Sequence, residues 1–425
     1  MQLEPKAEDQ WLTHRIETAF SQESQNCNVP LKIGLAVSGG GDSIAMLHLL
    51  ATQANRSDQF FVATVDHGLR PEAQEEAAFV AQTCAAYNLP HEILHWENWD
   101  GQGNMQAQAR TARYALLADW GARNWLDIIA LGHTQDDVAE TFLMRLARGS
   151  GLDGLAAMED RFDRHGTRFV RPLLSVERDM LRRYLTRRGH TWHDDPSNED
   201  PRFQRVTARK VLGQLAPLGI GVNEISNAAS ELQLAKSALR HSVRKHAEII
   251  VEFQGGDIVI TWKAWAITHV EVQRRLLNAM LQFVGGTNFP PRADAVTDLE
   301  AKLHEPGSHT LNGCLVSASS QELRVAREFN AVKRTETTAN ELWDARWKMK
   351  GDNNTGATVR ALGEDGLDQC ENWRETGLPR RSLLASPSLW KGRELVAAPL
   401  AGLPNGWCAT LTRSREQFLS ELLSH

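Results

Sequence analysis

The stretch Ser38-Gly39-Gly40-Gly41-Asp42-Ser43 lies between a strand-like run, residues 31–37, and a helix-like run, residues 44–53. Ile33, Leu35 and Val37 alternate on one face of the first run, and apolar residues recur at helical spacing in the second. Glycines at such a junction let backbone N–H groups approach an anion closely, and the helix N-terminus adds positive partial charge. The stretch therefore predicts a phosphate-binding loop, with an unliganded Gly/Ser-rich turn as the alternative.

Two common nucleotide-binding motifs do not fit this loop. A Walker A loop requires Lys and Ser or Thr where this chain has Gly40 and Gly41. A dinucleotide fingerprint requires a third glycine where this chain has Ile44, although Asp66 could still serve as a ribose-binding acid. The pattern S-G-G-x-D-S instead resembles the PP-loop of the ATP pyrophosphatases, which cleave ATP between its α- and β-phosphates. That resemblance implies that the loop holds pyrophosphate.

The composition is that of a globular protein with room for two or three domains. No run of about 18 apolar residues occurs, so we expect no membrane span, and the polar N-terminus is unlike a secretory signal. The five cysteines form no C-x-x-C pair, which favours a reducing cytoplasm over a zinc ribbon or a cysteine-ligated cluster. The net charge is −6, but basic residues outnumber acidic ones between Arg161 and Lys210. That segment either binds a polyanion or forms a solvated, arginine-rich helix.

Strand-like and helix-like segments alternate over the first 215 residues. After the first strand, further strands are expected at residues 60–66, 91–96, 127–132 and 169–174, each followed by a helix-like segment. Strands joined through helices pair in parallel, so we expect an α/β fold with a parallel sheet flanked by helices. Ligands bind beyond the carboxyl ends of such strands, where Ser38, Asp66 and His133 lie. The alternation predicts one site at this edge.

The pattern changes after about Leu215. We expect a long helix at residues 223–251, a strand at 257–262, helices at 270–283 and 295–303, and a hairpin within 307–325 with Gly313 near its turn. Residues 335–358 are polar and predict a linker. The expected domains are a catalytic domain at 1–215, a mainly helical domain at 216–334 and a small α+β domain at 359–425.

An acidic helix start follows the strand at residues 127–132. His133, Asp137 and Glu140 are three or four residues apart, so they share one face. Such a face could hold Mg²⁺ through water or bind the amine of a cationic substrate. The alternative is that Asp136 caps the helix and the acidic face is simply solvated.

Basic side chains also occur near the glycine-rich loop and the acidic helix start in the expected fold. Arg70 follows the turn at Gly68 and could pair with a phosphate, or the segment could be only a turn. Other basic and aromatic residues share helix faces that suit phosphate contacts or a stacked base: Arg110, Arg113 and Tyr114 on one helix, and Arg202, Arg205 and Arg209 as a basic stripe.

These residues together resemble the tRNA(Ile)-lysidine synthetase family. Most of residues 31–210 takes part in the resemblance. The pattern departs at residues 205–209, where the family usually shows R-N-x-[IVL]-R and this chain has Arg205-Val206-Thr207-Ala208-Arg209. The matching segments are Ser38 to Ser43, Asp66 to Arg70, Gly103-Asn104, Ala109-Arg110, Ala112 to Tyr114, Leu131 to Thr141, Arg145, Arg148-Gly149, Arg171 to Leu174, Asp195 to Asn198 and Leu395 to Pro399.

The resemblance implies an adenine-nucleotide α-hydrolase-like fold and a two-step reaction in the cytoplasm. ATP with Mg²⁺ would adenylate the wobble cytidine of a tRNA(Ile) with a CAU anticodon. Free L-lysine would then attack C2 of the base to give lysidine, which switches codon reading from AUG to AUA. The second and third domains would bind tRNA. A homodimer is one option for the oligomeric state.

The resemblance also implies roles for individual residues. The catalytic candidates are Asp42, which could hold Mg²⁺, and His133, Asp137 and Glu140. The ATP-binding candidates are Ser38, Gly39, Gly40, Gly41, Asp42, Ser43, Asp66, His67 and Arg70, and the RNA-binding candidates are Arg110, Arg113, Tyr114, Arg145, Arg148, Arg205 and Arg209. The alternatives are a tRNA thiolase, another PP-loop ATP pyrophosphatase and a catalytically silent RNA-binding protein.

Overall fold

A computed structural model describes residues 4–24, 30–52, 58–68, 72–97, 105–156, 158–194, 204–287, 290–351 and 356–424. The chain divides into two compact units, Met1–Lys236 and Ser237–His425. The boundary lies within one long helix, α9 (Val222–Ile250), and not near residue 215, where the hydrophobic pattern changes. None of the helices in the described ranges is long and apolar enough to cross a membrane.

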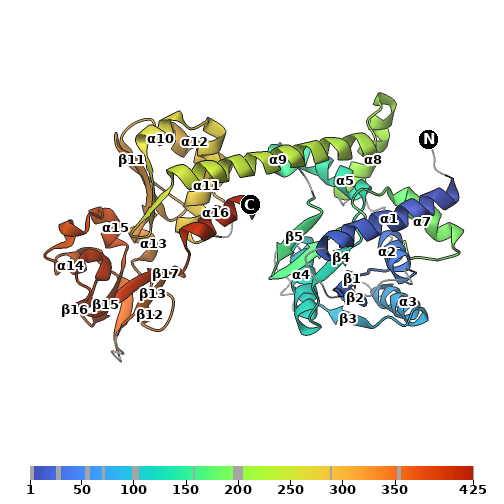
Figure 1. Cartoon of the computed structure of the whole chain (residues 1–425), viewed down its shortest axis with the longest axis horizontal. Helices are drawn as coiled ribbons and strands as arrows, with labels where there is room; N and C mark the ends of the chain where they lie inside the picture. Colours follow the sequence, from blue (N-terminus) through green and yellow to red (C-terminus); the bar gives the residue numbers. More distant parts are fainter. Residues whose placement is uncertain are drawn as a thin grey trace. The chain divides into compact units, whose positions relative to one another are not determined.

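The first unit is built on a six-stranded sheet in the order β3-β2-β1-β4-β6-β5 (Figure 1). All neighbours pair in parallel except β5, which is antiparallel to β6. The strands are β1 (Lys32–Ala36), β2 (Gln59–Asp66), β3 (His91–His95), β4 (Ile128–Leu131), β5 (Arg161–Arg164) and β6 (Thr167–Val170). The parallel sheet is confirmed. The β5–β6 hairpin is an addition, because short, charged β5 carries no apolar alternation.

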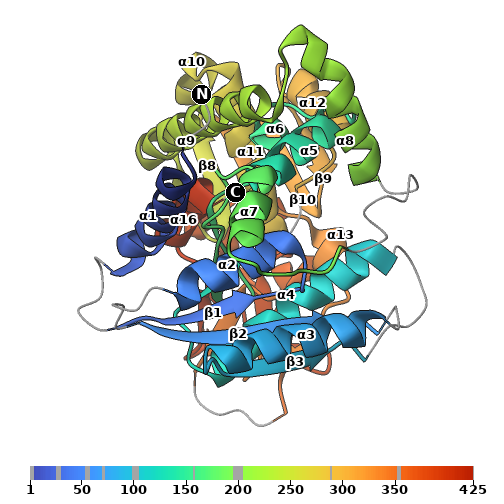
Figure 2. The ribbon, with the colours of Figure 1, turned by 90° about the vertical axis from the view of Figure 1, so that its right-hand side faces the viewer.

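Helices cover both faces of this sheet (Figure 2). One hydrophobic core joins β1 to α1, α2, α3 and α7, and includes Ile33, Leu35 and Val37. A second core packs α4 against the other face, where Trp120 lies beside Gly34. The helices of the unit are α1 (Pro5–Ser24), α2 (Gly41–Ala51), α3 (Glu72–Ala86), α4 (Met105–Arg123), α5 (Gln135–Leu146), α6 (Leu152–Leu155), α7 (Arg178–Arg187) and α8 (Gln204–Leu215), with α9 following a short turn, η2 (Ala216–Leu218).

The second unit begins with helices packed on a five-stranded antiparallel sheet, β7-β8-β11-β10-β9. The expected hairpin is present, and Asn312 and Gly313 at its turn both have positive φ, as a two-residue hairpin loop requires. The elements are β7 (Glu252–Gln254), β8 (Asp257–Thr261), α10 (Trp262–Ile267), α11 (Val270–Gly285), α12 (Ala293–Lys302), β9 (Gly307–Leu311), β10 (Cys314–Ala318), β11 (Glu322–Arg327) and α13 (Phe329–Val332).

The rest of the second unit contains two smaller sheets, β12-β14-β15-β16 and β13-β17. Trp343, Trp347 and Met349 are buried in the core between them, so the described part of the expected linker is folded. The elements are β12 (Thr337–Thr338), β13 (Trp347–Lys350), β14 (Thr358–Ala361), α14 (Gly363–Leu367), η3 (Trp373–Thr376), α15 (Arg380–Leu384), β15 (Pro387–Lys391), β16 (Glu394–Ala397), η4 (Pro399–Ala401), β17 (Cys408–Leu411) and α16 (Arg415–Ser424).

Candidate active site

The glycine-rich loop connects β1 to the first turn of α2. Gly39 has a φ of +88°, a backbone conformation that residues other than glycine rarely adopt. The Ser43 hydroxyl accepts a hydrogen bond from the Ser38 N–H at 3.1 Å and donates one to the Gly40 carbonyl at 2.9 Å. These bonds fix the loop around the N-terminus of α2, where free N–H groups and the helix dipole favour an anion.

The loop after β4 lies directly beside the glycine-rich loop. The strands β1 and β4 are neighbours, and the chain continues from β1 to β2 toward one edge of the sheet and from β4 to the β5–β6 hairpin toward the other edge. A Cβ on Gly132 would lie 3.0 Å from the Ser43 Cα, so any other residue would push the two loops apart by a few tenths of an ångström. The point between β1 and β4 is the switch point at which open α/β sheets bind ligands. It brings His133 next to the phosphate loop.

The start of α5 is capped by Thr134 and Asp137. The Asp137 carboxylate accepts hydrogen bonds from the Thr134 N–H at 2.9 Å and from its hydroxyl at 3.0 Å. Asp136 instead accepts the backbone N–H of Arg178 at 2.8 Å. The alternative in which Asp136 caps α5 beside a solvated acidic face is therefore wrong. Glu140 and Asp137 are both buried.

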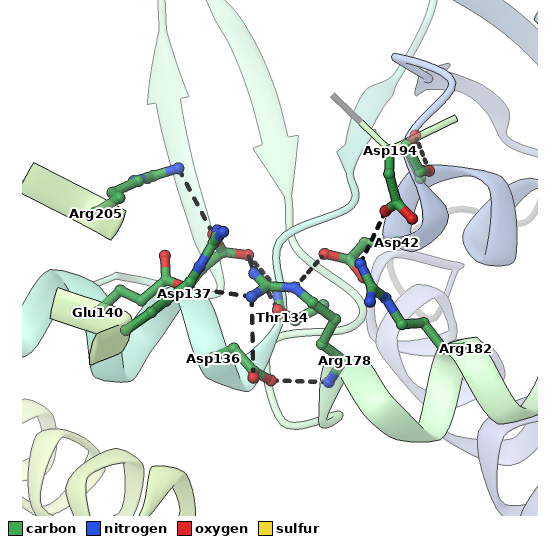
Figure 3. A network of polar contacts seen from close by, with 12 residues as sticks. Asp42, Thr134, Asp136, Asp137, Glu140, Arg178, Arg182, Asp194 and Arg205 are labelled. Carbon is green, nitrogen blue, oxygen red and sulfur yellow. Dashed lines mark hydrogen bonds and ion pairs between the residues drawn. The ribbon is translucent and has the colours of Figure 1, made fainter. Parts of the chain in front are cut away.

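Arg178, at the start of α7, joins acidic groups of α2 and α5 (Figure 3). Its Nε donates to the Asp42 carboxylate at 3.1 Å, and one terminal nitrogen donates to Glu140 at 3.1 Å. The other terminal nitrogen lies 3.6 Å from Asp137. Arg178 was not among the expected site residues, because in the sequence it is one of several arginines on a helix that could be solvated. The signal available in the sequence was charge: three acids expected at one edge require nearby cations.

Two arginines of α8 complete the network. Arg209 donates to Glu140 at 2.5 Å, and Arg205 lies 3.7 Å from Asp137. They pair with the acids of α5 while staying about one-third exposed, so their assignment to RNA stays a prediction, and Arg202 lies outside the described residues. We call this set the acid–arginine network. Its members are Asp42, Asp136, Asp137, Glu140, Arg178, Arg205 and Arg209.

Burial and neighbouring charge shift the ionisation of the site. Burial raises the pKa of Asp42 to about 6, with Asp137 and Asp136 adding to the effect and Arg178 opposing it. Burial also acts to raise the pKa of Asp137, but His133, Arg178, Arg205 and the Thr134 N–H outweigh it and lower that pKa. At neutral pH both carboxylates are mainly charged.

Burial lowers the pKa of His133 to about 3, and the charges of Arg171, Arg113 and Arg205 add to this effect against the opposing charge of Asp137. His133 is therefore neutral throughout the physiological range. A neutral imidazole at this position can donate one hydrogen bond and accept one.

The segment after β2 is mainly a turn. The Asp66 carboxylate is buried and accepts the Gly68 N–H at 2.8 Å, and Gly68 has a φ of +64°. These contacts confirm the turn at Gly68, whereas phosphate pairing by Arg70 stays a prediction. His67 packs edge-on against Trp96 at 5.8 Å between ring centroids, and Arg70 lies outside the described residues.

The expected RNA-binding residues of α4 and α5 fall into different environments. Tyr114 is 3% exposed and packs against Phe162 and Phe169, so the expectation that its ring stacks on a base is wrong. Arg110 is exposed. Arg145 donates to the Gly154 carbonyl at 2.6 Å, and Arg148 donates to the Gln204 side chain. Burial lowers the pKa of Arg113.

Comparisons with known proteins identify the family. Residues 12–216 match the family described as the PP-loop domain. The tRNA(Ile)-lysidine synthase of Ruegeria pomeroyi is 44% identical over 97% of this chain and 98% of that protein. The synthase of Zymomonas mobilis is 40% identical over 60% of this chain and 77% of that protein. Among solved structures, the U34-tRNA thiolase NcsA of Methanococcus maripaludis aligns at 17% identity and a TM-score of 0.46, over 54% of this chain and 80% of that one. The chain belongs to the tRNA(Ile)-lysidine synthase family.

Proposed function

We propose that the chain joins free L-lysine to C2 of the wobble cytidine of a CAU-anticodon tRNA(Ile) and converts ATP to AMP and pyrophosphate. In the first step the C2 carbonyl oxygen attacks the α-phosphorus of ATP and pyrophosphate leaves. In the second step the lysine ε-amine attacks C2 and AMP leaves. The observation that carries this proposal is the meeting of a phosphate loop with a buried acid–arginine network at the switch point of the sheet.

The glycine-rich loop serves the first step. Its fixed backbone and the N-terminus of α2 offer N–H groups to the pyrophosphate oxygens as their charge grows. No group of three potential metal ligands occurs among the described residues, and Mg²⁺ commonly uses one or two carboxylates with substrate phosphates. Asp42 fits this donor chemistry, and Asp42 would hold Mg²⁺ beside the loop. When bound, Mg²⁺ would offset charge on the phosphate oxygens.

Asp137 and Glu140 suit the ammonium group of lysine. Four carboxylates of the network face three guanidinium groups, which leaves one negative charge for a cation. The Glu140 side chain is 0% exposed, and its Oε2 atom has no hydrogen-bond partner among the described residues. A buried carboxylate oxygen without a partner is costly, so a donor that arrives with the substrate would be favoured.

The anticodon loop would contact the basic side chains near the site. Arg110 and Arg148 are exposed and lie on α4 and just after α5. A wobble base in a single-stranded loop can leave its stack and enter a pocket, where positive charge would hold its backbone. Because tRNA is the proposed substrate, we infer a cytoplasmic enzyme. The homodimer stays a prediction, and light scattering of the purified chain tests it.

One assay separates this proposal from its alternatives. The chain is incubated with ATP, Mg²⁺, radiolabelled lysine and tRNA(Ile) transcript, and both AMP and labelled tRNA are measured. We expect equal amounts of the two. AMP without label in RNA would overturn the lysine step, and tRNA binding without AMP would indicate a silent RNA-binding protein. Asp42→Asn is the matched variant: we expect it to bind tRNA but to release no AMP.

A thiolase is disfavoured by the burial of two of the cysteines. Cys84 and Cys314 are buried, and burial raises the pKa of each thiol to about 12. A thiol in such surroundings supplies little thiolate for sulfur transfer. The same assay with a sulfide source in place of lysine should leave the tRNA unthiolated.

A further inference from the structure

Arg171 contacts the ring of His133 from the end of β6. Its Nε–H donates to His133 Nδ1 at 3.2 Å. A guanidinium has only donors, so Nδ1 must be the unprotonated, accepting nitrogen of the imidazole. The remaining ring proton then resides on Nε2, and this nitrogen has no hydrogen-bond partner among the described residues.

Arg171 is itself held in place by its surroundings. It is 8% exposed, and its backbone N–H donates to the Asp160 carbonyl at 2.8 Å. One terminal nitrogen donates to the Glu159 carbonyl, and the guanidinium lies 4.2 Å from the centre of the Phe162 ring. These contacts on several sides prevent the side chain from turning away, so the donor remains aimed at His133.

We propose that Arg171 is a positioning residue that holds His133 in one tautomer, as a neutral imidazole with its proton on Nε2. This inference rests on the proposed function, in which His133 lies beside the reacting nucleotide. It assigns His133 the role of a hydrogen-bond donor to a phosphate oxygen. It also excludes His133 as the base that takes a proton from the lysine amine.

The charges around His133 support this assignment. Arg171, Arg113 from α4 and Arg205 from α8 all disfavour a second proton on the ring, whereas Asp137 from α5 favours one. Burial and the three guanidinium groups prevail and hold the pKa of His133 near 3. An imidazole with so low a pKa is a weak base at neutral pH, but its N–H remains an effective donor.

The tautomer can be read without any assay of activity. Full-length protein labelled with ¹⁵N-histidine is studied by long-range ¹H–¹⁵N NMR, and His133→Gln identifies the His133 signals by their loss. We expect a protonated Nε2 and an unprotonated Nδ1 that do not titrate between about pH 5 and 8. In Arg171→Met we expect mixed tautomers and a pKa raised toward 6.5.

Two further variants keep the test decisive if Arg171→Met folds poorly. Arg171→Lys retains a donor and a charge, so it should restore part of the single-tautomer signal. Arg168→Met removes an exposed arginine of the same strand and should leave the His133 signals unchanged. A protonated Nδ1 in the unaltered protein, or an unchanged tautomer in Arg171→Met, would overturn the assignment whether or not lysidine forms.

The pH profile of the first step gives the functional readout. Single-turnover pyrophosphate release by the unaltered protein should show no inflection that depends on His133 between about pH 5 and 8. In Arg171→Met the ratio of the rate at pH 6 to that at pH 8 should fall by up to about fourfold relative to the unaltered protein, because a ring with a pKa near 6.5 is about three-quarters protonated at pH 6. An inflection near pH 7 in the unaltered protein that His133→Gln abolishes would show that His133 acts as a base.

Discussion

Glu140→Gln tests whether the buried acids of α5 recognise the lysine ammonium group. The substitution keeps the shape of the side chain and removes its charge. In the structure Oε1 of Glu140 already accepts from Arg178 at 3.1 Å and from Arg209 at 2.5 Å, whereas Oε2 has no partner among the described residues. The variant therefore removes one acceptor available to a substrate cation, and it makes the acid–arginine network neutral overall.

The size of the effect follows from this single contact. A hydrogen bond to a charged group contributes about 1.5–3 kcal/mol, and each 1.4 kcal/mol corresponds to a factor of ten. We therefore expect the KM for lysine to rise about 10- to 100-fold. Arg178 keeps its contacts with Asp42 and Asp137 in the variant. Pyrophosphate release should consequently change far less, by about threefold or less.

The two steps are measured separately on the same preparation. Pyrophosphate release with tRNA but without lysine reports adenylation, and labelled lysine in tRNA at varied lysine concentration reports the second step. Glu231→Gln, an exposed acid on α9, is the matched control and should behave as the unaltered protein. Thermal unfolding checks that both variants fold. An unchanged KM for lysine together with lost pyrophosphate release would refute the assignment of Glu140 to the lysine step.

Three further predictions concern the surrounding structure. Burial and the stacked His190 ring lower the pKa of buried His48 to about 4. The neutral ring therefore contributes at most about 3 kcal/mol to the free energy of unfolding. This contribution is complete above pH 6.5 and is lost as the pH falls toward 4. The free energy of unfolding in urea should differ less between pH 7.5 and pH 5 in His48→Gln than in the unaltered protein. An equal difference in the two proteins would contradict this prediction. Gly132→Ala, which places Cβ against the Ser43 backbone, should cost about 1–3 kcal/mol in thermal unfolding and slow pyrophosphate release; unchanged values of both would show that the loops can move apart. Tyr114→Leu, which removes the aromatic face, should leave tRNA affinity within about twofold in filter binding, whereas loss of a stacked base would weaken binding by about 1–3 kcal/mol.

The fold of the first unit could be predicted because its signals are local. Alternation of Ile33, Leu35 and Val37 identified β1, and the glycines identified the turn into α2. The segment around Trp343 could not be predicted in the same way. Its tryptophans stand among polar residues without periodicity, and they are buried only through contacts with distant strands such as β17. Local composition therefore indicated a linker where long-range packing forms a core.

In the candidate site too, the residues that follow strand ends could be predicted, whereas those that depend on long-range packing could not. Asp42, His133, Asp137 and Glu140 follow strand ends, and neighbouring parallel strands bring such residues to one edge whatever the rest of the fold does. Tyr114 was misassigned because its helix face was inferred without knowing what packs on it. The aromatic cluster with Phe162 and Phe169 depends on the β5–β6 hairpin, which the sequence pattern did not reveal.

The contacts of Arg178 could have been expected from electrostatics but not from sequence spacing. It pairs with Asp42 across 136 positions of the chain, so no spacing rule could identify the contact. Electrostatics could have done so, because several carboxylates gathered at a buried edge are unstable without compensating cations. The arginines satisfy most of that requirement and leave one negative charge. A site arranged in this way stays folded without substrate and still attracts one more cation, which is the requirement for binding an ammonium group beside a phosphate loop.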